Sequence, residues 1–128
     1  MKVFTIHGNT PSSKNSRVYT GKHFIASKAT RKWYTDTVND FINQKEEFLK
    51  EISKCEKPYL IEFKFYRGSK HKFDYINPAQ TIQDAMVKHG WLEDDNCDEM
   101  IPVFSTYVYD KENPRLEIKI LNGKEKSI

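Results

Sequence analysis

A long amphipathic segment, from Ser27 to about Ile52, constrains the fold more than any other feature of this sequence. Its apolar side chains are spaced mostly by three, four or seven residues, the spacing of one face of an α-helix. The apolar positions are Trp33, Tyr34, Val38, Phe41, Ile42, Phe48, Leu49 and Ile52. Ser27 is a suitable N-cap. The sequence therefore predicts a long helix, with a break, if there is one, near Asn43 and Gln44.

Strand-like patterns lie on both sides of this helix. Residues 2–7 alternate polar and apolar side chains, as a half-buried strand does, and a short extended piece follows around residues 23–25. The strongest strand candidate is Tyr59–Tyr66, a run rich in aromatic and aliphatic residues. Two further strands are predicted near residues 103–109 and 115–121, joined by a turn.

A second helix is predicted from about Pro78 to His89. Asn77 would be its N-cap, Pro78 its first residue and Gly90 its stop signal. His89 is expected to interact with the dipole at the C-terminal end of this helix. The predicted inward face consists of Ala79, Ile82 and Met86, and the opposite face of Asn77, Gln80, Asp84 and Lys88.

Helices and strands follow one another without regular β-α alternation, so the pattern favours the α+β class. We expect a single domain over residues 1–128, with a mixed sheet packed against two main helices. The sequence has no apolar run of about 18 residues and no secretory signal. It also has only two cysteines, Cys55 and Cys97. These features predict a cytoplasmic protein that has no contact with a membrane. The lack of a Walker-type loop argues against a nucleotide cofactor.

The charges are segregated along the chain. Seven Lys or Arg residues precede the first acid, Asp36, whereas residues 93–99 contain five acids. A basic segment binds a polyanion, but an acidic patch does so only when cations neutralise it. The two features together suit a metal-dependent enzyme that acts on nucleic acid. A solvated surface explains the charges alone equally well.

Three aspartates flank the second predicted helix, with Asp74 just before it and Asp94 and Asp95 just after it. If a fold-back of the chain or a partner subunit brings the two flanks together, these carboxylates form a site that suits Mg²⁺. Such an ion polarises a scissile phosphate and activates a bound water. Aspartates in these positions more often serve as caps and surface charges, so the spacing alone leaves both interpretations open.

Five pieces of the chain, in order, carry a family resemblance. Residues 74–77 read Asp-Tyr-Ile-Asn, residues 84–86 read Asp-Ala-Met, and residues 90–95 read Gly-Trp-Leu-Glu-Asp-Asp. They resemble the Asp-x-Asp-Asn, Asp-Ala-Leu-like and Gly-x-x-x-Asp-Asp elements of the RusA family of phage-type Holliday junction resolvases. Residues 6–16 resemble the opening strand and Pro-Ser-x-x-Asn loop of that family, and residues 113–118 resemble its closing strand. The resemblance therefore spans nearly the whole chain.

The resemblance implies a RusA-like fold and a homodimeric endodeoxyribonuclease that nicks four-way DNA junctions symmetrically, in recombination and repair. It further implies Mg²⁺ as cofactor, with Mn²⁺ as a substitute. The matching positions imply Asp74 and Asp95 as catalytic, metal-binding carboxylates, with the catalytic Asp94 beside them. Basic and polar side chains around this acidic site would place a DNA backbone at the ion, although a lysine taken alone is more often an ordinary surface charge. The expected DNA contacts are Lys14, Asn15, Arg17, Lys22, Arg67, Lys70, Lys72, Asn77 and Gln80.

Two positions depart from the family pattern. Ile76 stands where the second aspartate of the Asp-x-Asp-Asn element is expected, and Gln80 stands where a lysine is expected. Isoleucine cannot bind a cation, so either another group replaces the carboxylate or the activity is reduced. The nearest candidate groups are Asp84, which we include among the metal ligands, Asn77 and Glu99. The alternatives are therefore a branched-DNA binding protein that has lost its activity through Ile76, and a general Mg²⁺ nuclease without junction preference.

Overall fold

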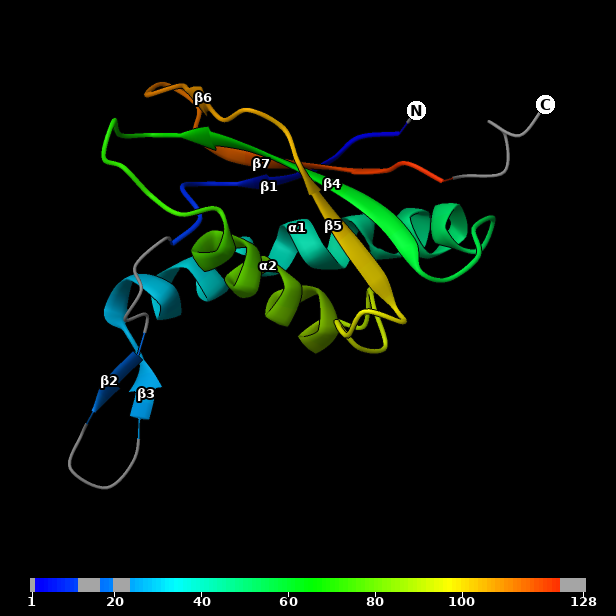
Figure 1. Ribbon diagram of the computed structural model, residues 1–128. Helices are drawn as coiled ribbons and strands as arrows, with labels where there is room; N and C mark the ends of the chain where they lie inside the picture. Colours follow the sequence, from blue (N-terminus) through cyan, green and yellow to red (C-terminus); the bar gives the residue numbers. More distant parts are fainter. Residues whose placement is uncertain (1, 12–16, 20–23, 123–128) are drawn as a thin grey trace.

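A five-stranded mixed sheet and two helices make up the body of the protein in the computed structural model (Figure 1). The structure describes residues 2–11, 17–19 and 24–122. The elements, in chain order, are β1 (Phe4–His7), β2 (Arg17–Tyr19), β3 (Phe24–Ala26), α1 (Lys28–Ile52), β4 (Tyr59–Arg67), α2 (Ile76–Lys88), β5 (Met100–Phe104), β6 (Val108–Tyr109) and β7 (Arg115–Ile120). This arrangement confirms the predicted α+β class.

The strand order β1-β7-β4-β5 places β4 and β7 in the middle of the sheet. Strand β7 is antiparallel to both β1 and β4, whereas β5 and the short β6 both pair with β4 in parallel. The single strand predicted near residues 103–109 is therefore two short strands, and neither pairs with β7, because β4 lies between them. Strands β2 and β3 form a separate ribbon that projects beside the start of α1 (Figure 1).

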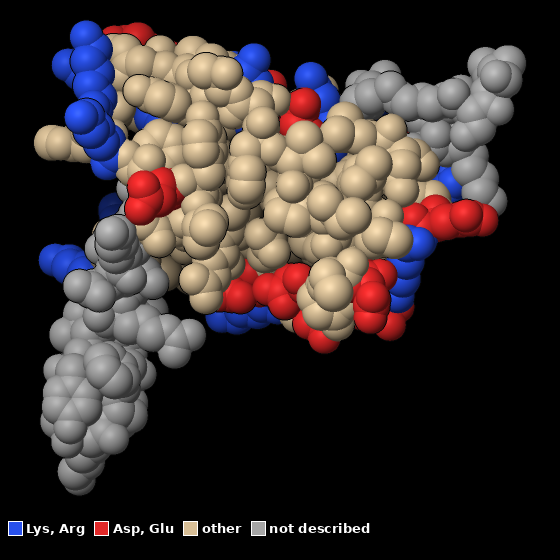
Figure 2. Space-filling view, viewed as in Figure 1, with Lys and Arg blue, Asp and Glu red and all other residues tan. Residues whose placement is uncertain are grey.

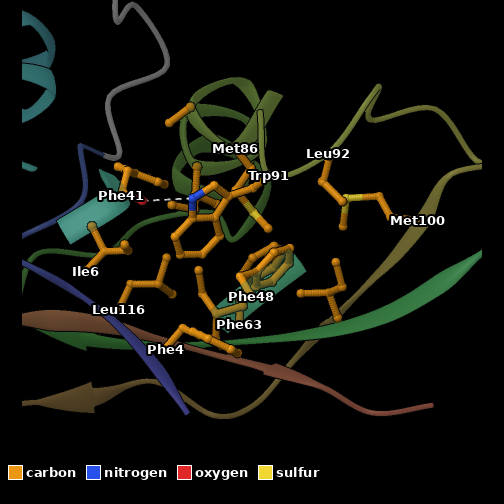
Figure 3. Close-up of a cluster of buried hydrophobic side chains, with 14 of the residues drawn as sticks. Phe4, Ile6, Phe41, Phe48, Phe63, Met86, Trp91, Leu92, Met100 and Leu116 are labelled. Atoms are coloured by element: carbon orange, nitrogen blue, oxygen red, sulfur yellow. Dashed lines mark hydrogen bonds between the residues drawn. The ribbon is translucent and has the colours of Figure 1, made fainter. Parts of the chain in front are cut away.

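Both helices cover the same face of the sheet. Alternate residues of β4 and β7 are buried, including Ile61, Phe63 and Leu116, while the residues between them are partly exposed. Figure 3 shows Trp91 in the middle of the resulting core, between α1, α2 and the sheet. Its indole N–H donates to the carbonyl of Phe41 at 3.0 Å, and its ring stacks on Phe48 at 4.5 Å.

Helix α1 is continuous from its predicted N-cap to its predicted end. The hydroxyl oxygen of Ser27 accepts a hydrogen bond from the backbone N–H of Thr30 at 3.2 Å. There is no break near Gln44, because this residue has a role within the regular helix. Its side-chain amide pairs with both backbone groups of Thr5, at 3.0 and 2.8 Å, and Asp40 accepts from the N–H of His7 at 2.8 Å. Among the described strands, β1 is at the edge of the sheet, and these bonds from α1 provide partners for backbone groups on its open side.

The start of α2 differs from the prediction. The helix begins at Ile76, and Tyr75 rather than Asn77 occupies the N-cap position, without a side-chain capping bond. Pro78 is consequently the third helical residue, a position that suits it because the first N–H groups of a helix lack intrahelical partners. The tertiary reason lies in Tyr75, whose ring stacks on Phe104 at 5.3 Å and so fixes where the chain enters the helix.

The end of α2 agrees with the prediction to within one residue. Gly90 has a φ of +78°, and its N–H donates to the carbonyl of Val87 at 3.0 Å. The N–H of Trp91 donates to the carbonyl of Met86 at 2.8 Å, which completes a Schellman motif. The predicted inward residues of this helix, Ala79, Ile82 and Met86, are all buried.

His89 is not the cationic partner of the helix dipole that the sequence suggested. Its ring stacks on Phe41, with centroids 4.4 Å apart and planes 10° apart. Burial lowers the pKa of His89, and the nearby charges of Lys88 and Lys45 lower it further. The imidazole is therefore neutral at pH 7 and packs as an aromatic ring.

Candidate functional site

Asp74 lies at the surface in the connection between β4 and α2. Its two neighbours in the chain are anchored, since Phe73 and Tyr75 contact each other edge to face at 5.3 Å and Tyr75 also stacks on Phe104. The backbone carbonyl of Asp74 accepts from the N–H of Asn77 at 3.1 Å. Aromatic anchors on both sides therefore hold this carboxylate at the N-terminal end of α2.

Ile76 is the most exposed large hydrophobic residue at this end of the helix, with 71% of its surface accessible. It occupies the first helical position, two residues after Asp74. Of the candidate replacements for the missing carboxylate, Asn77 is half-buried in the same turn, and Asp84 is exposed about two turns further along α2.

Asp94 and Asp95 lie in a tight polar loop after α2. The Asp94 carboxylate accepts from the backbone N–H of Asp95 at 2.7 Å and from the side-chain amide of Asn96 at 3.0 Å. These two bonds lower the pKa of Asp94, so the group is ionised at neutral pH. The side chain of Asn96 in turn accepts from the N–H of Asp98 at 2.9 Å. The carboxylate of Asp94 is thus engaged in holding the loop together.

Glu99 has a structural role at this end of α2. It is 6% exposed, and its carboxylate accepts from Lys57 at 2.8 Å and from the backbone N–H of Glu93 at 3.3 Å. The same contact with Glu99 raises the pKa of Lys57. Because Glu99 lies with Asp94 and Asp95 rather than with Asp74, it does not replace the carboxylate missing at Ile76 within one protomer.

The two groups of carboxylates are separated by the length of α2. The 13 residues of this helix rise about 20 Å at about 1.5 Å per residue. Figure 1 places the connection that contains Asp74 and the loop that contains Asp94 at opposite ends of the helix. Within the described part of the chain, no three His, Cys, Asp or Glu side chains gather into a group that could hold a metal ion. Within one protomer, Asp74 therefore does not lie beside Asp94 and Asp95, and the chain does not fold back to join the two flanks of α2.

Lys and Arg side chains gather at the end of the molecule that carries β6 and the β4–α2 connection (Figures 1 and 2). Of the predicted DNA contacts, Lys70, Lys72 and Gln80 are exposed in this region or on α2, and Asn77 is half-buried. Others cannot be placed: Lys14, Asn15 and Lys22 lie outside the described residues, and only the backbone of Arg17 lies within them. Acidic side chains gather below the opposite end of α2 (Figure 2).

Arg67 is a correction to the predicted DNA contacts, because its side chain is 4% exposed. Its guanidinium donates to the backbone carbonyl of Thr10 at 2.6 Å and lies 4.6 Å from the centre of the Phe73 ring. Burial lowers the pKa of this guanidinium. Every second residue of β4 is buried, and Arg67 follows Phe63 and Phe65 in this alternation. The alternation in the sequence could therefore have predicted that Arg67 faces inward. Arg67 therefore ties the segment after β1 to the end of β4.

Two exposed aromatic residues near Asp74 were not singled out from the sequence. Tyr107 and Tyr109 are 41% and 42% exposed. Tyr107 contacts Phe73 edge to face at 5.2 Å, and the Nζ of Lys70 lies 5.0 Å from the centre of the Tyr109 ring. Aromatic residues in a strand-like segment are typical of a core, so the sequence alone contained no sign of this exposure.

Comparison with known proteins found no matching family model and no similar curated protein. In the part of the chain that the structure describes, no helix is both long and apolar enough to cross a membrane.

Proposed function

We propose that this protein is a RusA-like, Mg²⁺-dependent endodeoxyribonuclease that resolves four-way DNA junctions by symmetric cuts. The observation that carries the proposal is the order of the acidic motifs along α2 and its flanks, from Asp74 through Asp84 to Asp94 and Asp95. The exposed Lys70 and Lys72 just upstream of Asp74 support it, because phosphate contacts there would position a DNA backbone beside this carboxylate.

The separation of the carboxylates makes a dimer part of the proposal. In a two-fold dimer that pairs the α2 helices antiparallel, the N-terminal end of one helix meets the C-terminal end of the other. Asp74 of one protomer would then lie beside Asp95 of the partner subunit, and symmetry would produce two such sites, one for each strand to be cut. A cation held there would supply Lewis-acid chemistry to the scissile phosphate.

The first test is cleavage of a labelled synthetic four-way junction, with linear duplex as the substrate control. We expect paired, symmetric nicks that require Mg²⁺, disappear in EDTA and disappear in Asp95→Asn. Asp98→Asn is the matched control, because Asp98 is an exposed acid of the same loop outside the proposed ligand set. Cleavage that persists in Asp95→Asn would refute the assignment of this residue.

A mixing experiment tests the dimer-spanning site. Asp74→Asn and Asp95→Asn are each inactive as homodimers under the proposal. A mixed dimer of the two variants contains one site in which both aspartates are intact, so mixing should restore nicking of one strand. If each site lay within one protomer, no mixed dimer would have an intact site, and the mixture would stay inactive.

A non-catalytic branched-DNA binding protein is the second candidate, and the exposed Ile76 favours it. This side chain, 71% exposed, stands where the resemblance implies a cation-binding aspartate. Under this alternative the wild-type protein binds junctions without cutting them, in Mg²⁺ or in Mn²⁺. Ile76→Asp would then produce metal-dependent cleavage that the wild type lacks. If another residue replaces the missing carboxylate, the wild type itself cuts DNA and does not need this substitution.

A further inference from the structure

We infer that Tyr107, Tyr109, Lys70 and Lys72 form a binding site for unpaired DNA bases, which we call the Tyr–Lys patch. The inference rests on the proposed function only in naming DNA as the ligand. The site lies beside Asp74 but includes none of the proposed catalytic residues. It would hold the bases of a strand whose backbone passes Asp74.

Both tyrosines of the patch are exposed, and Tyr107 is firmly supported. Tyr107 is 41% exposed as a residue, and its ring contacts that of Phe73 at 5.2 Å between centroids, with ring planes 78° apart. The backbone N–H of Tyr107 donates to the hydroxyl of Tyr75 at 3.1 Å, and Tyr75 is itself stacked on Phe104. An aromatic ring held this way loses little conformational entropy when a base stacks on it, which is the property of a stacking platform.

The charges beside these rings match a polyanion. The Nζ of Lys70 lies over the Tyr109 ring, 5.0 Å from its centre, so the phosphate of a nucleotide that approaches this ring meets a cation. Lys70 and Lys72 are exposed, and neither forms an ion pair with another described residue. The nearby Asp110 is already paired with Arg115 at 3.0 Å. The exposed carboxylate of Asp74 lies beside the patch, so the two lysine charges face one negative charge.

These features favour an unpaired strand over other occupants. Bases in a duplex are stacked on one another, so the faces that the tyrosines need are accessible only in unpaired segments. A second copy of this chain is disfavoured, because a two-fold contact through the patch would bring the lysines of both copies together. Stacking on tyrosine is also tolerant of base identity, so the patch predicts little sequence preference.

The test is a binding titration in EDTA, followed by fluorescence anisotropy, with two labelled probes of equal length and charge. One is oligothymidylate about 12 nucleotides long, within the site size of single-strand binding modules, and the other is the matching abasic strand. We expect the wild type to prefer the thymidylate. Tyr107→Leu and Tyr109→Leu should each weaken thymidylate binding about 10-fold and leave abasic binding almost unchanged.

Conservative and distant variants complete the design. Tyr107→Phe and Tyr109→Phe keep the ring and should bind as the wild type does, which also separates loss of stacking from loss of folding. Lys70→Gln should weaken binding of both probes, whereas Lys50→Gln, which removes an exposed charge from α1, should change neither.

Three outcomes would overturn the inference. First, the wild type could bind both probes equally well. Second, the folded leucine variants could bind thymidylate as tightly as the wild type does. Third, the wild type could form a dimer in solution that the leucine variants do not form. Because the titration needs no cleavage, its result stands apart from that of the nuclease test. If the titration contradicts the patch, metal-dependent cleavage can still be observed. If the protein does not cut DNA, it can still prefer the thymidylate probe.

Discussion

Replacing Gly90 by alanine should destabilise the protein by about 1–2 kcal/mol, the cost of the left-handed conformation for a residue with a Cβ. Gly90 has a φ of +78° at the end of α2. The added Cβ would also lie 2.9 Å from the Nζ of Lys45 and 3.3 Å from its Cε. These atoms are the far end of a flexible side chain that can move away, so the steric contact adds little. The backbone conformation therefore accounts for most of the loss.

The matched control is Gly68→Ala. Gly68 does not have a positive φ, and an added Cβ there would meet Pro114 at 3.4 Å and the side-chain oxygen of Asn9 at 3.8 Å, both ordinary contacts. Its loss should be smaller than that of Gly90→Ala. Gly90→Asn should fall between alanine and the wild type, because asparagine visits the left-handed region more readily than alanine does.

Urea unfolding followed by circular dichroism measures these differences. The midpoint should fall in the order wild type, Gly90→Asn, Gly90→Ala, with an unchanged slope m, since the change affects stability rather than the surface exposed on unfolding. A Gly90→Ala protein as stable as the wild type would refute the reasoning, and so would a Gly68→Ala loss of the same size. Either result would mean that the Schellman motif does not determine the path of the chain from α2 into the acidic loop.

Three further predictions concern the core and the edge of the sheet. Trp91→Ala should cost about 3–5 kcal/mol in urea unfolding, because Trp91 is 1% exposed and packs against both helices and the sheet. Gln44→Leu should cost about 1–3 kcal/mol by the same assay, because it leaves both backbone groups of Thr5 without their partner. The stability of the wild type should fall as the pH drops below about 6.5, because the unfolded chain then binds a proton at His89 that the folded chain, with its lowered pKa, does not. Urea midpoints at pH 7 and 5.5 should show a smaller fall for His89→Phe, and an equal fall in both proteins would contradict this assignment.

The elements that the sequence predicted well are those with local signals. Ser27 caps α1, Gly90 ends α2, and the aromatic run of β4 forms a strand, each as expected. The less accurate predictions depend on contacts between distant parts of the chain. The start of α2 shifted because Tyr75 stacks on Phe104, which follows it by more than twenty residues. The expected break in α1 is absent because Gln44 has partners in β1.

The candidate site was predicted as a set of residues but not as an arrangement. The sequence showed that aspartates flank a helix, and it left open whether they meet. The regular helix α2 keeps Asp74 and Asp94 at opposite ends, and Arg67 faces inward because it continues the alternation of β4. The exposure of Tyr107 does not follow from any local pattern.

The sequence by itself determined the α+β class, most of the secondary structure, and the helix ends at Ser27 and Gly90. These features depend on hydrogen bonds and apolar periodicity within a few residues of each other, so they can be seen in a short window of sequence. Only the tertiary structure decided which strands flank β4, which side chains of α1 are buried and which charged groups share a surface. These outcomes depend on the packing energy of the whole core, which is built by residues far apart in the chain. No single segment of the sequence is enough to determine that energy.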